Sequence, residues 1–167
     1  ILQYELLGST LDVGTGMIAA DKIIKTTSKA GVPNAVETIY IRHIKGGISE
    51  LTFKAYDQGR RSFQGTTLDF IWLDEEPEDQ AVFTECLTRT RYKPDEEKRI
   101  IYCTFTPLSG LSNLVLSFMP GGIFPHMGVN PDAPYRFISE ITWDDVPHLS
   151  EDWKAQALDS FADYEKD

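Results

Sequence analysis

The chain has 167 residues, a usual size for one domain and enough to bury a core without disulfides or a structural metal. Hydrophobic residues make up 41% and charged residues 25%, and no apolar run approaches the roughly 20 residues that span a bilayer. This composition excludes membrane-spanning helical, collagen-like and disordered proteins. Two cysteines, Cys86 and Cys103, are too few for a disulfide scaffold or a zinc site. Since no secretory pattern is present either, we expect an intracellular protein with no membrane partner.

The net charge of −10 is unevenly distributed along the chain. Residues 1–69 hold 8 basic and 7 acidic residues, whereas residues 70–167 hold 8 basic and 19 acidic residues. Nucleic acid is itself negatively charged, so we expect any contact with DNA to come from a local patch or from another part of the protein. The chain starts without methionine and stops just after a helical pattern, so we expect a piece of a longer protein.

The first third of the chain predicts a short helix followed by a β-hairpin. Residues 21–30 place two isoleucines and a threonine on one side and lysines on the others, and Gly31 ends this pattern, which favours a helix. Residues 36–56 alternate apolar and polar positions around Gly46 and Gly47, which is typical of a hairpin.

Three apolar runs, near 69–74, 99–104 and 135–141, predict parallel strands of one sheet. Helical patterns follow the first two runs, starting near Pro77 and at Ser112, and residues 120–134 are expected to form a loop. The alternation predicts a partial α/β domain over 1–167, with a parallel sheet flanked by helices and the hairpin inserted before it. A closing helix capped by Ser150 is expected to turn four residues inward, namely Trp153, Ala157, Leu158 and Phe161.

The most informative motif is FIWLDEEP at 70–77, four apolar residues followed by carboxylates. Ligands of a parallel sheet bind beyond the carboxyl ends of its strands, where this strand delivers Asp74 and Glu75. Two acids directly after a buried strand are costly without ligands. In P-loop nucleotide hydrolases the first such acid holds Mg²⁺, and an adjacent acid can activate the attacking water. The remaining acids are expected to be exposed and to complement a helix dipole: Glu76, Glu78 and Asp79.

A second motif, IYCTFTP at 101–107, ends the next predicted strand in two threonines and a proline. Hydroxyl groups of Thr104 and Thr106 at this strand end are suited to bind a γ-phosphate or its water. Taken alone, such residues are also ordinary turn formers. The Gly-Lys-Ser/Thr tripeptide that ends a phosphate-binding P-loop does not occur in the chain.

Together these motifs resemble the large subunit of tailed-phage terminases, the motor that packages viral DNA. The resemblance covers about residues 14–160 and rests on four blocks that occur in the expected order. These blocks are FKAYDQGRRSFQGTTLD at 53–69, WLDEEP at 72–77, TFTPLSGL at 104–111 and ITWDDVPHLS at 141–150.

The resemblance implies a P-loop NTPase-like fold and an ATPase that uses Mg²⁺. Asp74 resembles the Walker B acid that holds Mg²⁺ through water, and Glu75 resembles the acid that activates water. Thr104 and Thr106 resemble parts of the coupling motif, which links phosphate loss to movement. Arg60 lies where terminases place an arginine that acts across the subunit ring on a neighbour's ATP.

Arg61 is the competing candidate for that arginine. The resemblance further implies double-stranded DNA, the portal and procapsid, the terminase small subunit and a homo-oligomeric ring as partners, in the host bacterial cytoplasm. The Walker A segment would precede residue 1 and the nuclease domain would follow residue 167. We therefore expect the 167-residue chain alone to hydrolyse ATP hardly or not at all, because the P-loop supplies most phosphate contacts.

Two other interpretations remain open. A metal-dependent nuclease would draw on four acids for two cations, namely Asp69, Asp74, Glu75 and Glu76. Asp69 precedes the apolar run, however, which puts it roughly 16 Å from Asp74 at about 3.3 Å per residue. In the other interpretation, the chain is an inactive prophage remnant or a ring-assembly module without activity.

Overall fold

The computed structural model describes residues 2–9, 12–65, 67–90, 99–106, 112–119, 127–130, 133–139 and 141–160. The chain divides into two compact units, Ile1–Thr104 and Phe105–Asp167. Both units mix helices with strands, so the predicted α/β class is confirmed at that level. The sequence-based expectation of a single partial domain over 1–167 stays a prediction.

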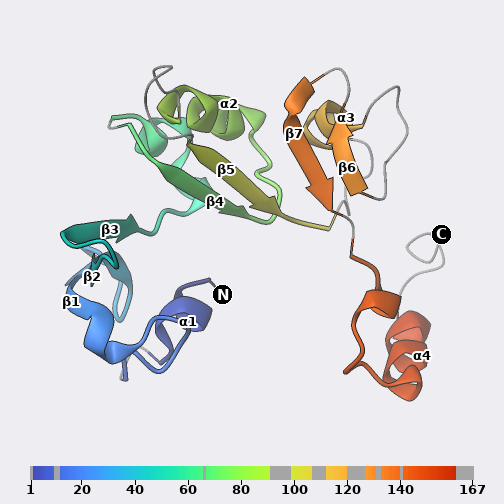
Figure 1. The fold of residues 1–167 in the computed structure, drawn as a ribbon, viewed down its shortest axis with the longest axis horizontal. Coiled ribbons are helices and arrows are strands. Elements are labelled where there is room, and N and C mark those ends of the chain that lie inside the picture. The colour runs from blue at the N-terminus through green and yellow to red at the C-terminus, as the bar shows by residue number, and fades with distance from the viewer. Residues whose placement is uncertain are drawn as a thin grey trace. The chain divides into compact units, whose positions relative to one another are not determined.

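The first unit begins with helix α1 (Leu2–Leu7) and an antiparallel sheet of three strands, in the order β1 (Ile23–Ser28), β2 and β3 (Figure 1). Strands β2 (Val36–Arg42) and β3 (Ile48–Thr52) form the hairpin predicted over 36–56. The side chain of Gln3 in α1 accepts a hydrogen bond from the backbone N–H of Val36 at 3.1 Å, which ties the helix to the sheet.

The helix predicted over 21–30 is wrong. Residues Ala20–Lys22 form one 3₁₀ turn, and Ile23–Ser28 is strand β1, antiparallel to β2. The segment contains two isoleucines and two threonines, whose β-branched side chains fit a pleated surface better than a helix. The hairpin offers a free edge, and pairing with that edge decides the conformation.

A parallel pair of strands, β4 (Phe70–Asp74) and β5 (Ile100–Thr104), forms the centre of the rest of this unit. Their register runs from Phe70 beside Ile100 to Asp74 beside Thr104, which confirms the predicted parallel pairing of these two strands. Both strands therefore end at the same edge of the sheet.

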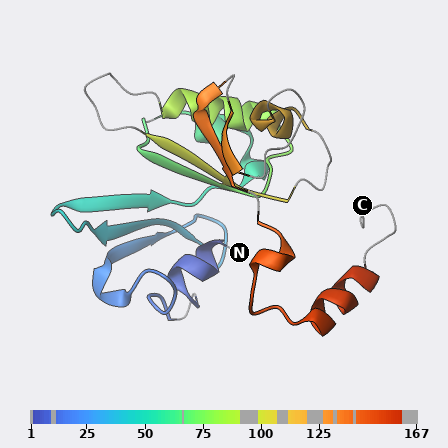
Figure 2. The same cartoon turned by 45° about the vertical axis from the view of Figure 1, so that its right-hand side comes forward.

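Helix α2 (Gln80–Arg89) lies along one face of the β4–β5 pair, as Figures 1 and 2 show. The buried apolar side chains of this region come from both layers: Ile71, Leu73, Val82, Phe83 and Cys86. On the opposite face Phe70 and Tyr102 remain about half exposed. The expectation that β4 is buried on both faces is thus wrong for this unit, where burial alternates along the strand.

The second unit contains α3 (Asn113–Phe118), β6 (Met127–Asn130), β7 (Ala133–Ser139) and α4 (Glu151–Ser160). Strand β7 pairs antiparallel with β6, from Ser139 beside Met127. The third parallel strand predicted at 135–141 is therefore wrong in its pairing, and the loop predicted at 120–134 is wrong where β6 lies. The short apolar stretch of β6 is surrounded by glycines and prolines, and this composition concealed the strand.

Helix α4 begins as predicted, because the Ser150 hydroxyl accepts a hydrogen bond from the backbone N–H of Trp153 at 3.2 Å. Trp153 is not buried: it is 48% exposed, and its ring lies 5.7 Å from that of Trp143. The Leu158 side chain and Phe161 lie outside the described residues. Across the described part of the chain, no helix is both long and apolar enough to cross a membrane.

Candidate functional site

The carboxyl ends of β4 and β5 bring Asp74 and Thr104 together, as the sequence predicted. The Thr104 hydroxyl donates a hydrogen bond to Asp74 Oδ1 at 3.3 Å and accepts one from the indole N–H of Trp72 at 2.8 Å. An indole N–H can only donate, so it orients the hydroxyl proton toward the carboxylate. Asp74 is thereby held in place by a side chain from the neighbouring strand.

The last residue of β4 and the turn that follows it, residues 74–77, form what we call the acidic turn. Its second residue, Glu75, has an exposed side chain and a backbone φ of +62°. Among the described non-glycine residues, only Asn34 shares a positive φ, and asparagine tolerates this conformation more readily than glutamate does. Such a conformation costs on the order of 1–3 kcal/mol and persists only where surrounding contacts enforce it.

Two contacts enforce the backbone conformation of Glu75. Its N–H donates to the Thr104 carbonyl at 2.8 Å, which extends the β4–β5 ladder by one bond. The Tyr56 hydroxyl lies 3.0 Å from the carbonyl oxygens of both Asp74 and Glu75 and donates to them. The Tyr56 ring also stacks on Phe63, with centroids 6.4 Å apart. The backbone of the acidic turn is therefore held both by Thr104 and by Tyr56.

Burial, followed by nearby Cys103 and Asp74, raises the pKa of the Tyr56 hydroxyl above its usual value. The hydroxyl is consequently protonated, and able to donate, at neutral pH. Neither Tyr56 nor Trp72 was predicted from the sequence. Both lie within the motifs at 53–69 and 72–77, but no periodicity or spacing indicates contacts between residues 18 or 32 positions apart.

Where β4 and β5 end, the carboxylates of Asp74 and Glu75 and the hydroxyl of Thr104 offer oxygen ligands. Mg²⁺ prefers oxygen, and in nucleotide enzymes one or two carboxylates usually hold it together with water and substrate phosphates. The residues present therefore fit Mg²⁺ bound with a phosphate ligand. No group of three or more His, Cys, Asp or Glu side chains suited to a metal occurs in the described part of the chain.

Arg60 lies in the 3₁₀ turn Arg60–Phe63 and binds α2. Its Nε donates to Glu85 Oε2 at 2.9 Å, and Arg89 contacts the other carboxylate oxygen at 2.7 Å. Glu85 is only 2% exposed. The hydrogen bond from Arg60 lowers the pKa of Glu85 most strongly, with burial opposing it and Arg89 assisting. Glu85 was not predicted from the sequence, in which it is one acid of a helical pattern.

The other predicted residues are placed as follows. Arg61 is exposed, and its side chain makes no hydrogen bond or ion pair within the described residues. Thr106 is exposed and belongs to the second unit. Asp79 caps α2, since its Oδ1 accepts from the N–H of Ala81 at 2.9 Å. Glu78 is exposed as expected, whereas Glu76 is half-buried, contrary to expectation.

The positions of the acidic side chains argue against a two-metal nuclease site. Asp69 pairs with Arg99 at 3.1 Å, where β4 and β5 begin, whereas Asp74 lies where they end. The two carboxylates are separated by the length of the strand, as the sequence predicted, and do not share a metal site.

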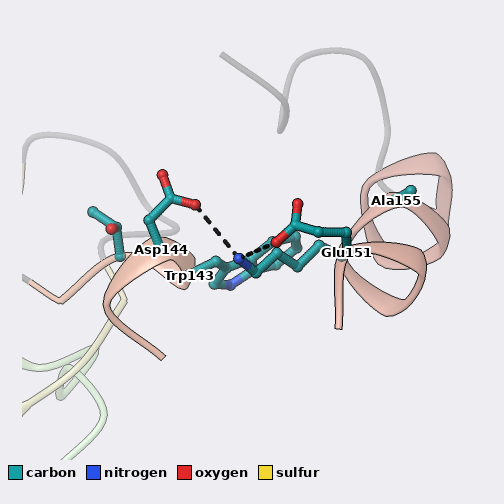
Figure 3. A pocket seen from close by; sticks show the side chains of 6 residues that line it. Trp143, Asp144, Glu151 and Ala155 are labelled. Atoms are coloured by element: carbon teal, nitrogen blue, oxygen red, sulfur yellow. Dashed lines mark hydrogen bonds and ion pairs between the residues drawn. The ribbon is translucent and has the colours of Figure 1, made fainter. Parts of the chain in front are cut away.

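A shallow depression in the second unit, drawn in Figure 3, lies between the turn Trp143–Asp145 and α4. Lys154 bridges this depression, with Glu151 at 2.8 Å and Asp144 at 3.5 Å. The hydrogen bond that Lys154 donates to the Glu151 carboxylate is the main cause that raises the pKa of Lys154. These ion pairs and the paired tryptophans join the turn to the helix, which is a structural role for the motif at 141–150.

Comparison with known proteins agrees with the resemblance inferred from the motifs. Residues 11–166 match the family model described as terminase large subunit, T4likevirus-type, N-terminal. The chain is also 31% identical, over 159 residues, to the terminase large subunit of Salmonella phage P22. That alignment covers 92% of the chain but 29% of the phage P22 protein. No solved structure matches the chain.

Proposed function

The chain belongs to the terminase large-subunit N-terminal family of the T4 type, and on that premise we propose that it is part of an ATP-hydrolysing motor that packages phage double-stranded DNA. The observation that supports the ATPase assignment best is the acidic turn. Asp74 is held by Thr104 at the end of a parallel strand pair, and Glu75 follows in an enforced backbone conformation. This is the edge at which α/β sheets bind their ligands.

Within this proposal, Asp74 holds Mg²⁺ through water and Glu75 is the general base. Mg²⁺ supplies charge neutralisation at the phosphates when it is bound. Glu75 takes a proton from the attacking water, for which an exposed carboxylate beside the metal position is suited. The Asp74 carboxylate is fixed by a side-chain hydrogen bond, whereas Glu75 is fixed through its backbone.

Thr104 and Thr106 form the proposed coupling segment. Thr104 already touches the proposed metal ligand, so a change at the phosphates alters its hydrogen bond to Asp74. Thr106 lies two residues further along, where the second unit begins. Movement of β5 at its carboxyl end is thus transmitted directly into the polypeptide that follows it.

Arg60 was predicted to act on the ATP of a neighbouring subunit, and its ion pair with Glu85 adds a condition to that proposal. Arg60 must leave Glu85 before it reaches another subunit, whereas the Arg61 side chain binds no described residue. We retain Arg60 as the proposed trans-acting residue, with Arg61 as its direct competitor. A guanidinium in this role spreads the charge of the phosphoryl transition state.

The proposed partners are double-stranded DNA, the portal and procapsid, the terminase small subunit and further copies of the same protein in a ring. The proposed location is the host bacterial cytoplasm. The metal-dependent nuclease is disfavoured for this chain, because Asp69 and Asp74 lie at opposite ends of β4. An inactive remnant or ring-assembly module remains the alternative that an activity measurement decides.

Two substitutions in the complete gene product test the assignment. Asp74→Asn is expected to weaken Mg²⁺-dependent ATP binding, whereas Glu75→Gln is expected to leave binding intact and to lower hydrolysis by about 10²–10⁴-fold. Binding is measured by isothermal titration and hydrolysis by phosphate release. Glu78→Gln is the matched control, since Glu78 is an exposed acid four residues from Asp74. Normal hydrolysis by Glu75→Gln, or loss of hydrolysis in Glu76→Gln instead, contradicts the assignment.

A further inference from the structure

The Tyr56 hydroxyl donates to the backbone of both Asp74 and Glu75 in the acidic turn. It lies 3.0 Å from the Asp74 carbonyl oxygen and 3.0 Å from the Glu75 carbonyl oxygen. A phenol has a single proton, so the two carbonyls share one donor in a three-centre hydrogen bond. This geometry requires the carbonyl groups of Asp74 and Glu75 both to point toward the Tyr56 hydroxyl.

The convergence of these carbonyls matters because Glu75 has a left-handed backbone. In a regular strand successive carbonyl groups point to opposite sides, so carbonyls of adjacent residues do not meet at one donor. At the acidic turn the φ of +62° at Glu75 allows them to do so. Without a donor at this position, the strained conformation loses a contact that enforces it.

The position of Tyr56 is itself well determined. Tyr56 begins the 3₁₀ turn Tyr56–Gln58, its ring is half-buried, and it stacks on Phe63 from the next turn. Tyr56 is separated from the acidic turn by 18 residues in the sequence, so the contact joins two distant segments. The second of these two 3₁₀ turns, Arg60–Phe63, carries both Arg60 and Arg61.

From this geometry we infer that Tyr56 is a positioning residue for the proposed general base, holding the Glu75 carboxylate where it meets the attacking water. The inference rests on the proposed ATPase function. It assigns to Tyr56 no contact with nucleotide or metal, so its effect is on the chemical step rather than on ATP binding. It also makes the position of the base depend on the loop that carries both arginines.

The test is Tyr56→Phe in the complete gene product, which removes one oxygen and keeps the ring. Misplacement of a catalytic group by about 1 Å costs up to about 10²-fold in rate, so we expect kcat for ATP hydrolysis to fall by about 10- to 100-fold. KM for ATP should change by less than about twofold, as befits an interaction that acts in the transition state. Tyr102→Phe is the matched control, because the Tyr102 hydroxyl has no bonded partner in the described residues.

A double-mutant cycle separates positioning from a general structural role. If Tyr56 acts through Glu75, adding Tyr56→Phe to Glu75→Gln should cause no further loss of hydrolysis. An equal loss in both backgrounds, a change confined to KM, or an unchanged kcat in Tyr56→Phe overturns the inference. In the last case an inactive Glu75→Gln leaves the proposed function standing, whereas an active Glu75→Gln overturns the proposed function itself.

Phe63→Leu gives a second route to the same answer, should Tyr56→Phe fold poorly. It removes the ring that stacks on Tyr56 but leaves the hydroxyl in place. The inference requires a smaller fall in kcat, an unchanged KM and, again, no effect in the Glu75→Gln background. A Phe63→Leu variant that lowers kcat equally with and without Glu75 overturns it.

Discussion

At the scale of single residues, the Thr104 hydroxyl links the two motifs that the sequence analysis singled out. It accepts from Trp72 and donates to Asp74, so a residue from the proposed coupling segment orients a residue of the acidic turn. Hydrogen bonds to a charged group contribute about 1.5–3 kcal/mol, more than those between neutral groups. The Thr104 hydroxyl therefore orients Asp74 and does not serve merely as part of a turn at the end of a strand.

Replacing Thr104 by Val preserves the shape of the side chain but removes both hydrogen bonds. We expect a loss of about 1–3 kcal/mol in the free energy of unfolding, since the Trp72 N–H is left without its acceptor. ATP hydrolysis should fall together with Mg²⁺-dependent binding, because Asp74 loses its orientation. Denaturant unfolding and phosphate release measure the two effects. Thr104→Ser keeps the hydroxyl and should retain most of both, and equal losses in Ser and Val variants would show that the methyl group matters instead.

The sequence predicted the acids and the threonine of this site but not the groups that hold them. Asp74, Glu75 and Thr104 were found because polar residues follow apolar runs, a local pattern. Tyr56 was missed because its hydroxyl meets backbone carbonyls, which carry no sequence signal. The left-handed conformation of Glu75 was also unpredictable, since glutamate has no preference for it.

At the scale of elements, a buried carboxylate joins the turn Arg60–Phe63 to helix α2. Glu85 accepts from Arg60 and Arg89, and Arg89 also donates to the Gly65 carbonyl at 3.1 Å. Breaking a buried ion pair by removing one charge leaves the remaining charges uncompensated. The loop that carries both arginines is thus fastened to the helix that covers the β4–β5 pair.

The Glu85 carboxylate makes stability depend on pH in a defined direction. Its folded pKa is lowered below the usual 4.5, chiefly by the hydrogen bond from Arg60. A group with a lowered folded pKa contributes stability above its unfolded pKa, and this contribution is lost as pH falls through the folded pKa. Between about pH 5 and about pH 3, we expect the melting temperature to fall less steeply in Glu85→Gln than in the wild type. Parallel curves for the two proteins would contradict the lowered pKa.

The same substitution distinguishes an anchoring role of Arg60 from a catalytic one. If Arg60 must leave Glu85 to act on a neighbouring subunit, Glu85→Gln should keep or raise ATP hydrolysis in the assembled ring, because the competing carboxylate is weakened. If Arg60 only anchors the loop, hydrolysis should fall. Glu78→Gln, an exposed acid outside this ion pair, is the control. Steady-state phosphate release at equal ring concentration measures the difference.

Sequence patterns were sufficient to predict some helices and strands, whereas strand pairing decided the conformation of others. The parallel β4–β5 pair, the hairpin and helix α2 follow from apolar periodicity and punctuation by glycine and proline. Strand β1 was mistaken for a helix, because Ile23–Ser28 has no strong period and its edge partner β2 lies eight or more residues away. Strand β7 was correctly recognised as a strand, but its antiparallel partner β6 lies in a segment whose composition predicted a loop.

At the scale of the whole molecule, the chain matches the family over nearly its whole length but spans 29% of the phage P22 relative. The chain contains no Gly-Lys-Ser/Thr tripeptide. We therefore predict that the purified 167-residue chain turns over ATP far more slowly than about 1 per second, the low end for ordinary enzymes. Phosphate release by the folded chain, checked by circular dichroism, tests this, and turnover at an ordinary rate would refute it.

Subunit mixing tests the proposed trans-acting arginine. Complete gene products that carry Arg60→Ala should bind ATP but hydrolyse it poorly, and mixing them with Glu75→Gln subunits should restore part of the activity. Restoration is expected because a hybrid interface pairs an intact base with an intact arginine. Arg61→Ala is tested in the same way, with DNA and procapsid present to permit assembly. Absence of recovery in a demonstrably mixed ring assigns Arg60 to its ion pair with Glu85 alone.

The central claim is that Glu75 is the base of an ATPase site at the carboxyl end of β4. It is tested most directly by single-turnover hydrolysis of ATP prebound with Mg²⁺ to the complete gene product, compared between wild type and Glu75→Gln. The proposed site predicts that both proteins hold ATP equally well and that the rate in Glu75→Gln is lower by about 10²–10⁴-fold. Equal single-turnover rates in the two proteins would contradict the claim.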